Sequence, residues 1–186
     1  MQRIGNDGRR RVILCSIIVA ILALTIVLDL ITKVHFAKLA KQATGYLYIP
    51  VIEGFFYFTF TENTGAAFSF LHNVSWGQTF FKVLTSISLI LFVALLVYYL
   101  FINKKNYIVA PISLSLIIGG TIGNFIDRLA FSKVRDFIGF TFGNYNFPIF
   151  NLADTFLVVG VILFIFHLLF LDESAVFKKN EGKWKK

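Results

Sequence analysis

Charged residues, cysteine and proline are scarce in this chain of 186 residues. Only 15% of the residues are charged, against about 25% in a typical soluble domain. There are three prolines and one cysteine, Cys15, and a single cysteine excludes an intramolecular disulfide framework. The apolar residues make up 57% of the chain and are clustered in long runs, which indicates membrane-spanning segments and argues against a soluble globule.

Four segments have the length and composition of transmembrane helices. The predicted spans are Val12–Leu28, Val83–Ile102, Tyr107–Ile126 and Leu152–Leu171. The first three contain no formal charge, and the fourth contains only Asp154. The sequence therefore predicts one membrane domain over residues 12–171. A basic tail over residues 1–11 precedes it, and a lysine-rich tail over residues 172–186, predicted to be disordered, follows it.

The basic residues predict the orientation of these spans. Eleven of the 18 lysines and arginines lie in the first tail, the connector 103–106 and the last tail, which all face one side if there are four spans. Such an excess is typical of cytoplasmic segments, so both termini are predicted to be cytoplasmic. The net charge of +8 is then a topology signal, and no nucleic-acid partner is expected.

With this orientation, one set of polar residues falls at the predicted outer edge of the membrane. They are Asp29, Lys33, Glu62, Asn63, Asn124, Asp127, Arg128, Asp136, Asn151 and Asp154. Helices joined by a short connector usually pack together. We therefore expect the carboxylates between Asp127 and Asp154 to converge.

Several of these residues also fit a purely structural role. Asn151 and Asp154 have the spacing of a capping box at a helix start. Asp29 and Lys33 have the spacing of a helical ion pair. Asp127 opposes the dipole at the end of its helix, and the adjacent Arg128 is expected to neutralise it.

Asp136 has a different setting, because it lies in the apolar stretch VRDFIGF. Burial there would raise its pKa, and the neighbouring Arg135 would lower it. If Asp136 approaches Asp154, repulsion between like charges keeps a proton on one of the two. A helix N-terminus favours the ionised form of Asp154. Such an acid and base are the pair needed to activate a water molecule and protonate an amide.

Other kinds of site find little support in the sequence. His35, His72 and His167 are far apart and lack the spacing of metal ligands, so no metal site is expected. The GGTIG stretch lacks the lysine of a phosphate-binding loop. In the first outer connector, FFYFTFTENTG alternates Phe and Thr before a turn signal, which predicts a small sheet on the membrane surface.

Two other functions fit a chain of this composition. Intramembrane acids also bind or relay ions in small transporters and proton channels, although such acids would be expected nearer the middle of the membrane. A non-catalytic anchor or assembly protein would also contain capped helices, and it would tolerate Asp154→Asn because Asn accepts the same capping bonds.

Four motifs in order resemble the lipoprotein signal peptidase (signal peptidase II) family. They are NTGAAFSF at 63–70, GGTIGNFIDRL at 119–129, VRDFI at 134–138 and FNLADTF at 150–156. The pattern of Asp29 and Lys33 agrees as well. The resemblance departs from the family at Arg135, where a Val-type residue is usual, and at Leu30, where Gln is frequent.

The resemblance implies an aspartyl protease of the bacterial cytoplasmic (inner) membrane, with its active site at the extracytoplasmic face. Such enzymes cut the signal peptide from prolipoproteins just before the diacylglyceryl-modified Cys, and globomycin blocks them. The implied fold is four transmembrane helices with a small outer sheet and a short surface helix. Asp136 and Asp154 would be the catalytic dyad. The implied supporting or substrate-binding residues are Asn63, Gly65, Asn124, Asp127, Arg128, Asn151, Asp29 and Lys33.

Overall fold

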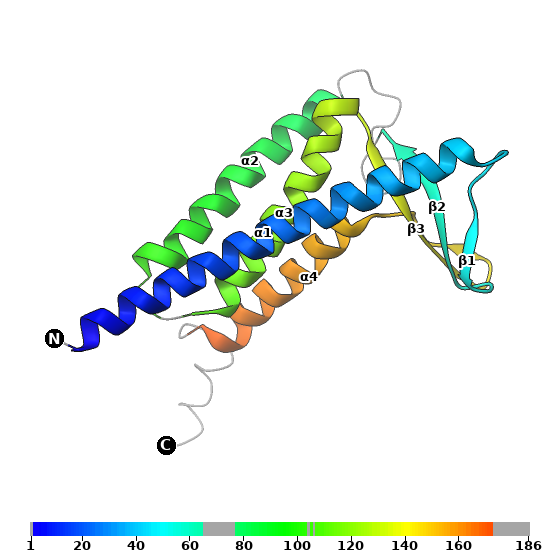
Figure 1. Ribbon diagram of the computed structural model, residues 1–186. Helices are drawn as coiled ribbons and strands as arrows, with labels where there is room; N and C mark the ends of the chain where they lie inside the picture. Colours follow the sequence, from blue (N-terminus) through cyan, green and yellow to red (C-terminus); the bar gives the residue numbers. More distant parts are fainter. Residues whose placement is uncertain (1, 65–76, 104, 106, 173–186) are drawn as a thin grey trace.

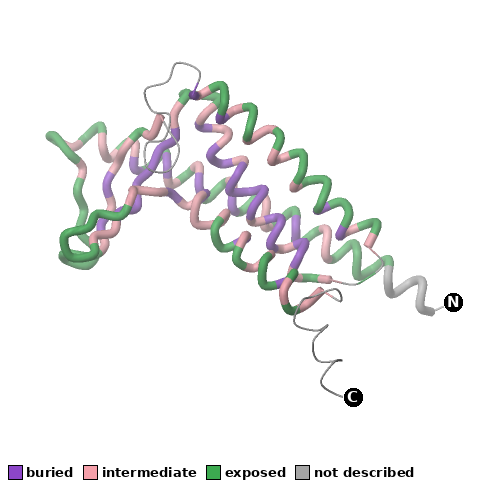
Figure 2. Tube along the Cα trace, turned by 180° about the vertical axis from the view of Figure 1, so that it is seen from behind, coloured by how far each residue is buried: buried purple, intermediate pink, exposed green. Residues whose placement is uncertain are grey.

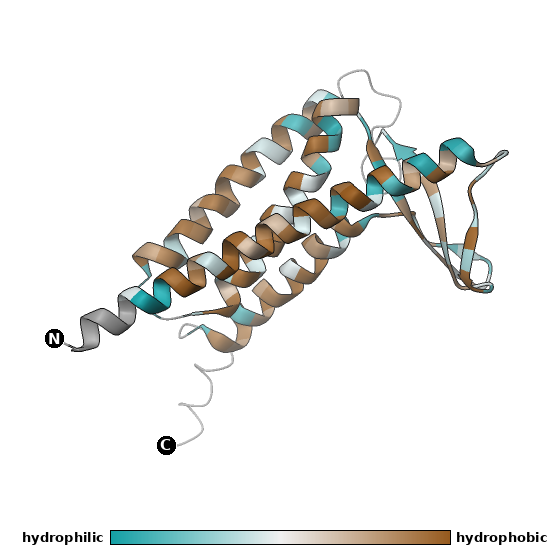
Figure 3. Ribbon diagram, viewed as in Figure 1, coloured by the Kyte–Doolittle hydropathy of each residue, from teal (hydrophilic) through white to brown (hydrophobic). Residues whose placement is uncertain are grey.

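Four long helices form most of the molecule (Figure 1). The structure, a computed structural model, describes residues 2–64, 77–103, 105 and 107–172, with side chains from residue 8 onward. The helices are α1 (Gln2–Gln42), α2 (Gly77–Val97), α3 (Val109–Phe131) and α4 (Leu152–Phe166). Two π-helical segments continue α2 and α4, namely η2 (Tyr98–Ile102) and η3 (His167–Leu171). All four helices are long and apolar enough to cross a membrane, as predicted, and Figure 3 shows the apolar residues along them.

The first helix is much longer than the predicted span Val12–Leu28. It continues to Gln42, because the chain has no glycine or proline between Gly8 and Gly45. Gly45 follows the helix end and has a φ of 103°, which a helix does not allow. The polar residues Asp29 and Lys33 end the apolar run, but they do not end the helix. Hydropathy predicted the apolar span, whereas the length of the helix depends on helix breakers.

The third helix lies at the centre of the bundle (Figure 2). In its most apolar stretch 67% of the residues are buried, against 11–17% in the other three helices. Glycines let the neighbouring helices approach it closely. A Cβ on Gly120 would collide with the main chain of Ala153 in α4, and a Cβ on Gly160 would lie 2.8 Å from the carbonyl oxygen of Ser113 in α3.

A small antiparallel sheet lies at one end of the bundle, away from the start of α1 (Figure 1). Its strands follow the order β1 (Ile49–Ile52), β2 (Phe56–Asn63), β3 (Val134–Phe142) and β4 (Tyr145–Asn146). The predicted strand in FFYFTFTEN is confirmed as β2. The extension of α1 supports the sheet, because Phe36 stacks on Phe137 of β3 with ring centroids 4.5 Å apart.

The sheet and the bundle meet where α3, β3 and α4 are connected. Ser132 ends α3 in the left-handed conformation, with a φ of 55°, and the chain turns directly into β3. Pairing of β3 with β2 sets Asp136 opposite Thr61. The chain then returns to begin α4 at Leu152, and this junction brings together the polar residues of four elements.

Two parts of the expected architecture are not seen. Every helix in the described ranges belongs to the four-helix bundle, so the short surface helix is not found among them. Gly65 and the tail 173–186 lie outside the described residues.

Candidate active site

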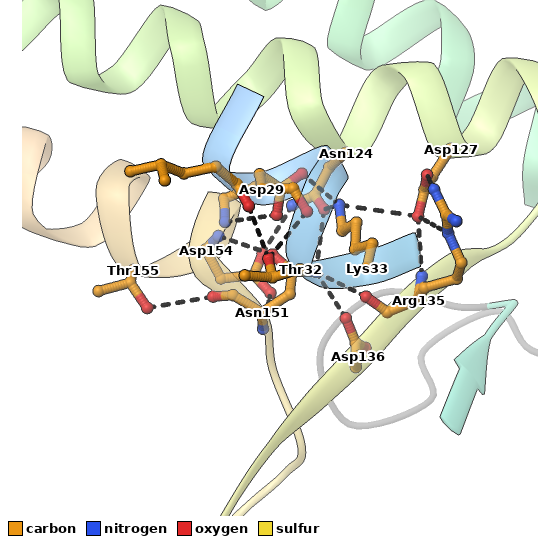
Figure 4. A network of polar contacts seen from close by, with 12 residues as sticks. Asp29, Thr32, Lys33, Asn124, Asp127, Arg135, Asp136, Asn151, Asp154 and Thr155 are labelled. Carbon is orange, nitrogen blue, oxygen red and sulfur yellow. Dashed lines mark hydrogen bonds and ion pairs between the residues drawn. The ribbon is translucent and has the colours of Figure 1, made fainter. Parts of the chain in front are cut away.

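Asn151 caps α4 and holds Asp154 in a fixed position (Figure 4). The side-chain oxygen of Asn151 accepts from the main-chain N–H of Asp154 at 3.0 Å. The Asp154 carboxylate accepts in return from the main-chain N–H of Asn151 at 3.1 Å. This is the predicted capping box, and it is confirmed. The hydrogen bond and the helix dipole both offset the cost of a carboxylate at the mouth of an apolar helix.

The side-chain amide of Asn151 also links Asp154 to Asp136. Its NH₂ group donates to Oδ1 of Asp136 at 2.6 Å and to Oδ1 of Asn124 at 3.0 Å. The NH₂ group of Asn124 in turn donates to Oδ1 of Asp154 at 2.7 Å. Two amides from two helices thus connect the two carboxylates that the sequence singled out.

Asp136 is 2% exposed, and its environment favours the protonated form. Burial is the main cause that raises its pKa, and the nearby negative charge of Asp154 raises it further, to about 7. Hydrogen bonds from Asn63, whose Nδ2 donates to Oδ2 of Asp136 at 3.2 Å, and from Asn151 act in the opposite direction. The structure therefore sets Asp136 in a buried position beside a second acid, as predicted.

A fully buried lysine lies beneath this pair. Nζ of Lys33 is 2.7 Å from Oδ2 of Asp29, which confirms the predicted helical ion pair. It also donates to Oδ1 of Asn124 at 2.9 Å. The other oxygen of Asp29 accepts from the main-chain N–H of Ala153 at 2.9 Å, so α1 provides a second cap for the start of α4.

The predicted pairing of Asp127 with Arg128 is wrong. Arg135 is the partner, and its Nη2 lies 2.6 Å from Oδ1 of Asp127. Adjacent residues on a helix point in directions about 100° apart, so Arg128 faces away from Asp127. The guanidinium of Arg135 is bound to Asp127, and burial together with the charge of Asp154 raises the pKa of Asp136 overall, as the apolar setting predicted.

Arg128 has a different position from the one expected. Its guanidinium lies 5.6 Å from the ring centroid of Phe81 in α2, and it lines the cavity described next. Among the described residues it forms no ion pair. It is therefore a cation at the edge of the site, free to interact with an anionic or carbonyl group of a ligand.

A cavity of about 510 Å³ opens beside the two carboxylates. Its other walls are apolar side chains of 134, of 147–150 and of α4, and its polar residues are Asn63, Asn124, Arg128, Asp136, Asp154 and Thr155. A ligand with an apolar body and one polar reacting group fits this distribution. Among the described residues, no three His, Cys, Asp or Glu side chains are placed to hold a metal ion.

The site also includes residues that sequence reasoning did not assign to it. Arg135 was expected to act on its neighbour Asp136, and residues 147–150 were assigned no role in the site. The available signal was the run FPIF directly before Asn151, since apolar residues at a helix mouth need a surface to contact.

Comparison with known proteins identifies the family. A family model described as signal peptidase (SPase) II matches residues 21–170. The chain belongs to the signal peptidase II family. It is similar to the lipoprotein signal peptidase of Bacillus pumilus (strain SAFR-032), with 43% identity over 144 residues, or 77% of this chain and 86% of the relative. The lipoprotein signal peptidase of Clostridium tetani (strain Massachusetts / E88) is 41% identical over 152 residues, or 81% of this chain and 91% of that relative.

Solved structures agree with this membership of the signal peptidase II family. A bacterial membrane enzyme determined by the in meso method at 2.3 Å resolution aligns with a TM-score of 0.71 and 32% identity, covering 92% of this chain and 93% of that one. A second bacterial membrane enzyme structure, at 1.9 Å resolution, aligns with a TM-score of 0.70 and 34% identity, covering 83% of this chain and 94% of that one. As a member of the signal peptidase II family, the protein is an aspartyl protease of a bacterial membrane.

Proposed function

We propose that Asp136 and Asp154 form the catalytic dyad of this protease. The substrate is a diacylglyceryl-modified prolipoprotein, and the cut falls on the N-terminal side of the lipidated Cys. The observation that carries the proposal is the link through Asn151, which holds both carboxylates at the edge of one cavity. The names of the similar proteins from Bacillus pumilus and Clostridium tetani support the choice of substrate.

The two carboxylates have the unequal environments that an acid and a base require. Asp136 is buried beside a second acid, and with a raised pKa of about 7 it holds its proton in about half of the molecules at neutral pH, where an ordinary Asp holds almost none. Asp154 accepts from the main-chain N–H of Asn151 and lies at a helix N-terminus, where unpaired N–H groups can interact with a negative charge. We therefore assign the general acid to Asp136 and the general base to Asp154.

In the proposed reaction Asp154 takes a proton from a water molecule while the water oxygen bonds to the scissile carbonyl carbon. Asp136 donates its proton to the carbonyl oxygen, which gives a tetrahedral diol. The C–N bond then breaks as Asp154 returns its proton to the leaving nitrogen, and Asp136 recovers a proton from one hydroxyl. The products are a carboxylic acid and a free amine, and both carboxyl groups return to their initial states.

The supporting residues hold the two carboxylates in position. Asn63, Asn124 and Asn151 donate to the two carboxylates. Lys33 donates a hydrogen bond to Asn124, and Asp29 accepts one from the first turn of α4. Arg128 lines the cavity and is assigned to the substrate main chain or to a lipid ester carbonyl. Gly65 lies outside the described residues, so its role remains the one that the resemblance implies.

The apolar walls of the cavity suit a substrate that lies in the membrane. Leu157, Val158 and Val159 extend the cavity along α4, within a span-length helix. A lipidated Cys carries acyl chains into the bilayer, which places the adjacent peptide bond at the membrane edge. The excess of basic residues in the terminal segments supports cytoplasmic termini, and we assign the site to the extracytoplasmic side of the inner membrane. A globomycin-type cyclic peptide would occupy the same cavity.

The test is cleavage of a purified prolipoprotein by the detergent-solubilised protein. The diacylglyceryl-modified substrate and the same substrate with an unmodified Cys are incubated side by side, and the products are identified by mass spectrometry. We expect one cut, directly before the Cys, in the modified substrate only. No cleavage, or a cut elsewhere, would overturn the proposal and redirect attention to ion transport.

A further inference from the structure

Arg135 directs three N–H groups at a single carboxylate, that of Asp127. Its main-chain N–H and its Nε donate to Oδ2 at 3.0 and 3.1 Å, and its Nη2 donates to Oδ1 at 2.6 Å. The guanidinium carbon also lies 4.8 Å from the ring centroid of Phe131, one turn further along α3. A buried fork of this kind has one preferred geometry, so it fixes the start of β3 against the end of α3.

This contact bears directly on Asp136, which is the next residue. The carbonyl oxygen of Arg135 accepts from Nδ2 of Asn151 at 3.4 Å, and the same Nδ2 donates to Oδ1 of Asp136 at 2.6 Å. The main chain of Arg135 is therefore held on one side by Asp127 and on the other by Asn151. The direction in which Asp136 leaves the strand depends on both contacts.

The same contact also bears on Asp154, through a lysine. Nζ of Lys33 lies 3.7 Å from Oδ2 of Asp127 but only 2.9 Å from Oδ1 of Asn124. Nζ of Lys33 also lies 2.7 Å from Oδ2 of Asp29, so Asp29 and Asn124 hold Lys33 while Arg135 makes the shorter contacts with Asp127. Asn124 then donates its NH₂ group to Asp154.

We propose that Arg135 is a positioning residue for the cleavage reaction: by binding Asp127, it orients Asp136 and leaves Lys33 in place to hold Asn124 and Asp154. This inference rests on the proposed function. Arg135 is not among the residues that line the cavity in the described part of the chain. It acts through Asp127 and contacts no reacting atom.

The charges around the dyad make the proposal testable. From α1 come Asp29 and Lys33, and from β3 comes Arg135; α3 contributes Asp127 and Arg128. On β2, Glu62 is half-exposed and paired with Lys133 at 2.5 Å, so its charge is already matched at the surface. The negative charges of Asp29 and Asp127 are balanced by the positive charges of Lys33 and Arg135. Removing Arg135 alone adds one negative charge beneath the dyad, removing Asp127 alone adds one positive charge, and removing both restores the balance.

The experiment compares pH profiles of kcat for the wild type, Arg135→Met, Asp127→Asn and the double variant. An added negative charge opposes loss of the catalytic proton, so Arg135→Met should move the alkaline limb of the profile to higher pH, on the order of one unit. Because the dyad also loses its positioning contact, kcat should fall roughly tenfold. Asp127→Asn should move the limb to lower pH. The double variant should return the limb to the wild-type position, and Arg135→Lys should recover part of the lost kcat.

Lys133→Met is the matched control, because Lys133 lies near the start of the same strand but forms an exposed ion pair. Its profile should equal that of the wild type. Limbs that stay in place in both single variants, or a double variant that does not return, would overturn the inference. If Arg135→Met fails to fold, an unshifted limb in Asp127→Asn is sufficient to overturn it. An inactive wild type would overturn the proposed function and this inference together; an active wild type with unshifted variants would overturn this inference alone.

Discussion

Asp29 accepts a hydrogen bond at 2.9 Å from the main-chain N–H of Ala153, which lies 124 residues further along the chain. Asp29 belongs to the first helix, and Ala153 to the first turn of the last helix. Both residues are fully buried, so bulk solvent does not compete for this bond. The polar network beneath the dyad is therefore part of what holds α1 and α4 together, as well as part of the site.

Loss of the buried lysine should destabilise the fold strongly. Lys33→Met leaves Asp29 without its ion-pair partner in a buried position, and breaking such a pair costs about 3–5 kcal/mol. The matched control is Lys133→Met, which removes an exposed lysine from its pair with Glu62 and should cost about 0–1 kcal/mol. Unfolding titrations in mixed SDS micelles measure both. Equal losses would contradict the assigned role of Lys33.

The stability of the folded protein should fall as pH rises from 5 to 8. Folded Asp136 keeps its proton up to a pKa of about 7, whereas its ordinary value is 3.8. Between these values the folded state binds more protons than the unfolded state, so stability decreases with pH by up to about 1.4 kcal/mol per unit. The Tm of the wild type and of Asp136→Asn is measured at pH 5 and 8. The wild type should lose more Tm over this range, and parallel curves would contradict the assignment.

Two substitutions at Asn151 should separate helix capping from positioning of the dyad. Ser accepts the capping bond from Asp154 almost as well as Asn, but it lacks the NH₂ group that donates to Asp136. Asn151→Ser should therefore keep near-wild-type stability and lose about 10–100-fold in kcat, which corresponds to one hydrogen bond to a charged or polarised group. Asn151→Ala should lose kcat and also about 1 kcal/mol of stability. Full activity in the Ser variant would show that Asn151 only caps the helix.

Close packing of α3 and α4 should not tolerate a side chain at Gly160. An added Cβ would lie 2.7 Å from a side-chain carbon of Ile117 and 2.8 Å from the carbonyl oxygen of Ser113. Gly160→Ala should cost about 1–3 kcal/mol through overpacking. Gly8→Ala is the control, since its Cβ would meet nothing within 4 Å and Ala favours a helix by about 1 kcal/mol. SDS unfolding should move in opposite directions for the two variants.

The sequence was sufficient to predict the elements whose pattern is local. The four spans, the strand in FFYFTFTEN and the cap at Asn151 each depend on residues close together in the chain, and all three predictions are confirmed. Strand β3 was not predicted, because six of its residues, from Val134 to Gly139, are buried on both faces, so it lacks the alternation of a half-exposed strand. The Gly143–Asn144 step between β3 and β4 was the available turn signal.

Partners within the polar network could not be predicted from sequence distance. Adjacency suggested Arg128 for Asp127, but the helix turns these two side chains apart. The true partner, Arg135, reaches Asp127 only because Ser132 reverses the chain with a positive φ. Such a reversal at a serine has no clear sequence signal, since glycine is the usual residue in this conformation.

The most direct test of the account is prolipoprotein cleavage by Asp136→Asn, Asp154→Asn and Asp127→Asn, each purified and shown to be folded. Asn keeps much of the hydrogen bonding at each position but cannot exchange a proton as a carboxyl group does. The account predicts no detectable cleavage by the first two variants and reduced but measurable cleavage by Asp127→Asn. Cleavage by Asp154→Asn at a rate near that of the wild type would reduce that residue to a helix cap and contradict the dyad.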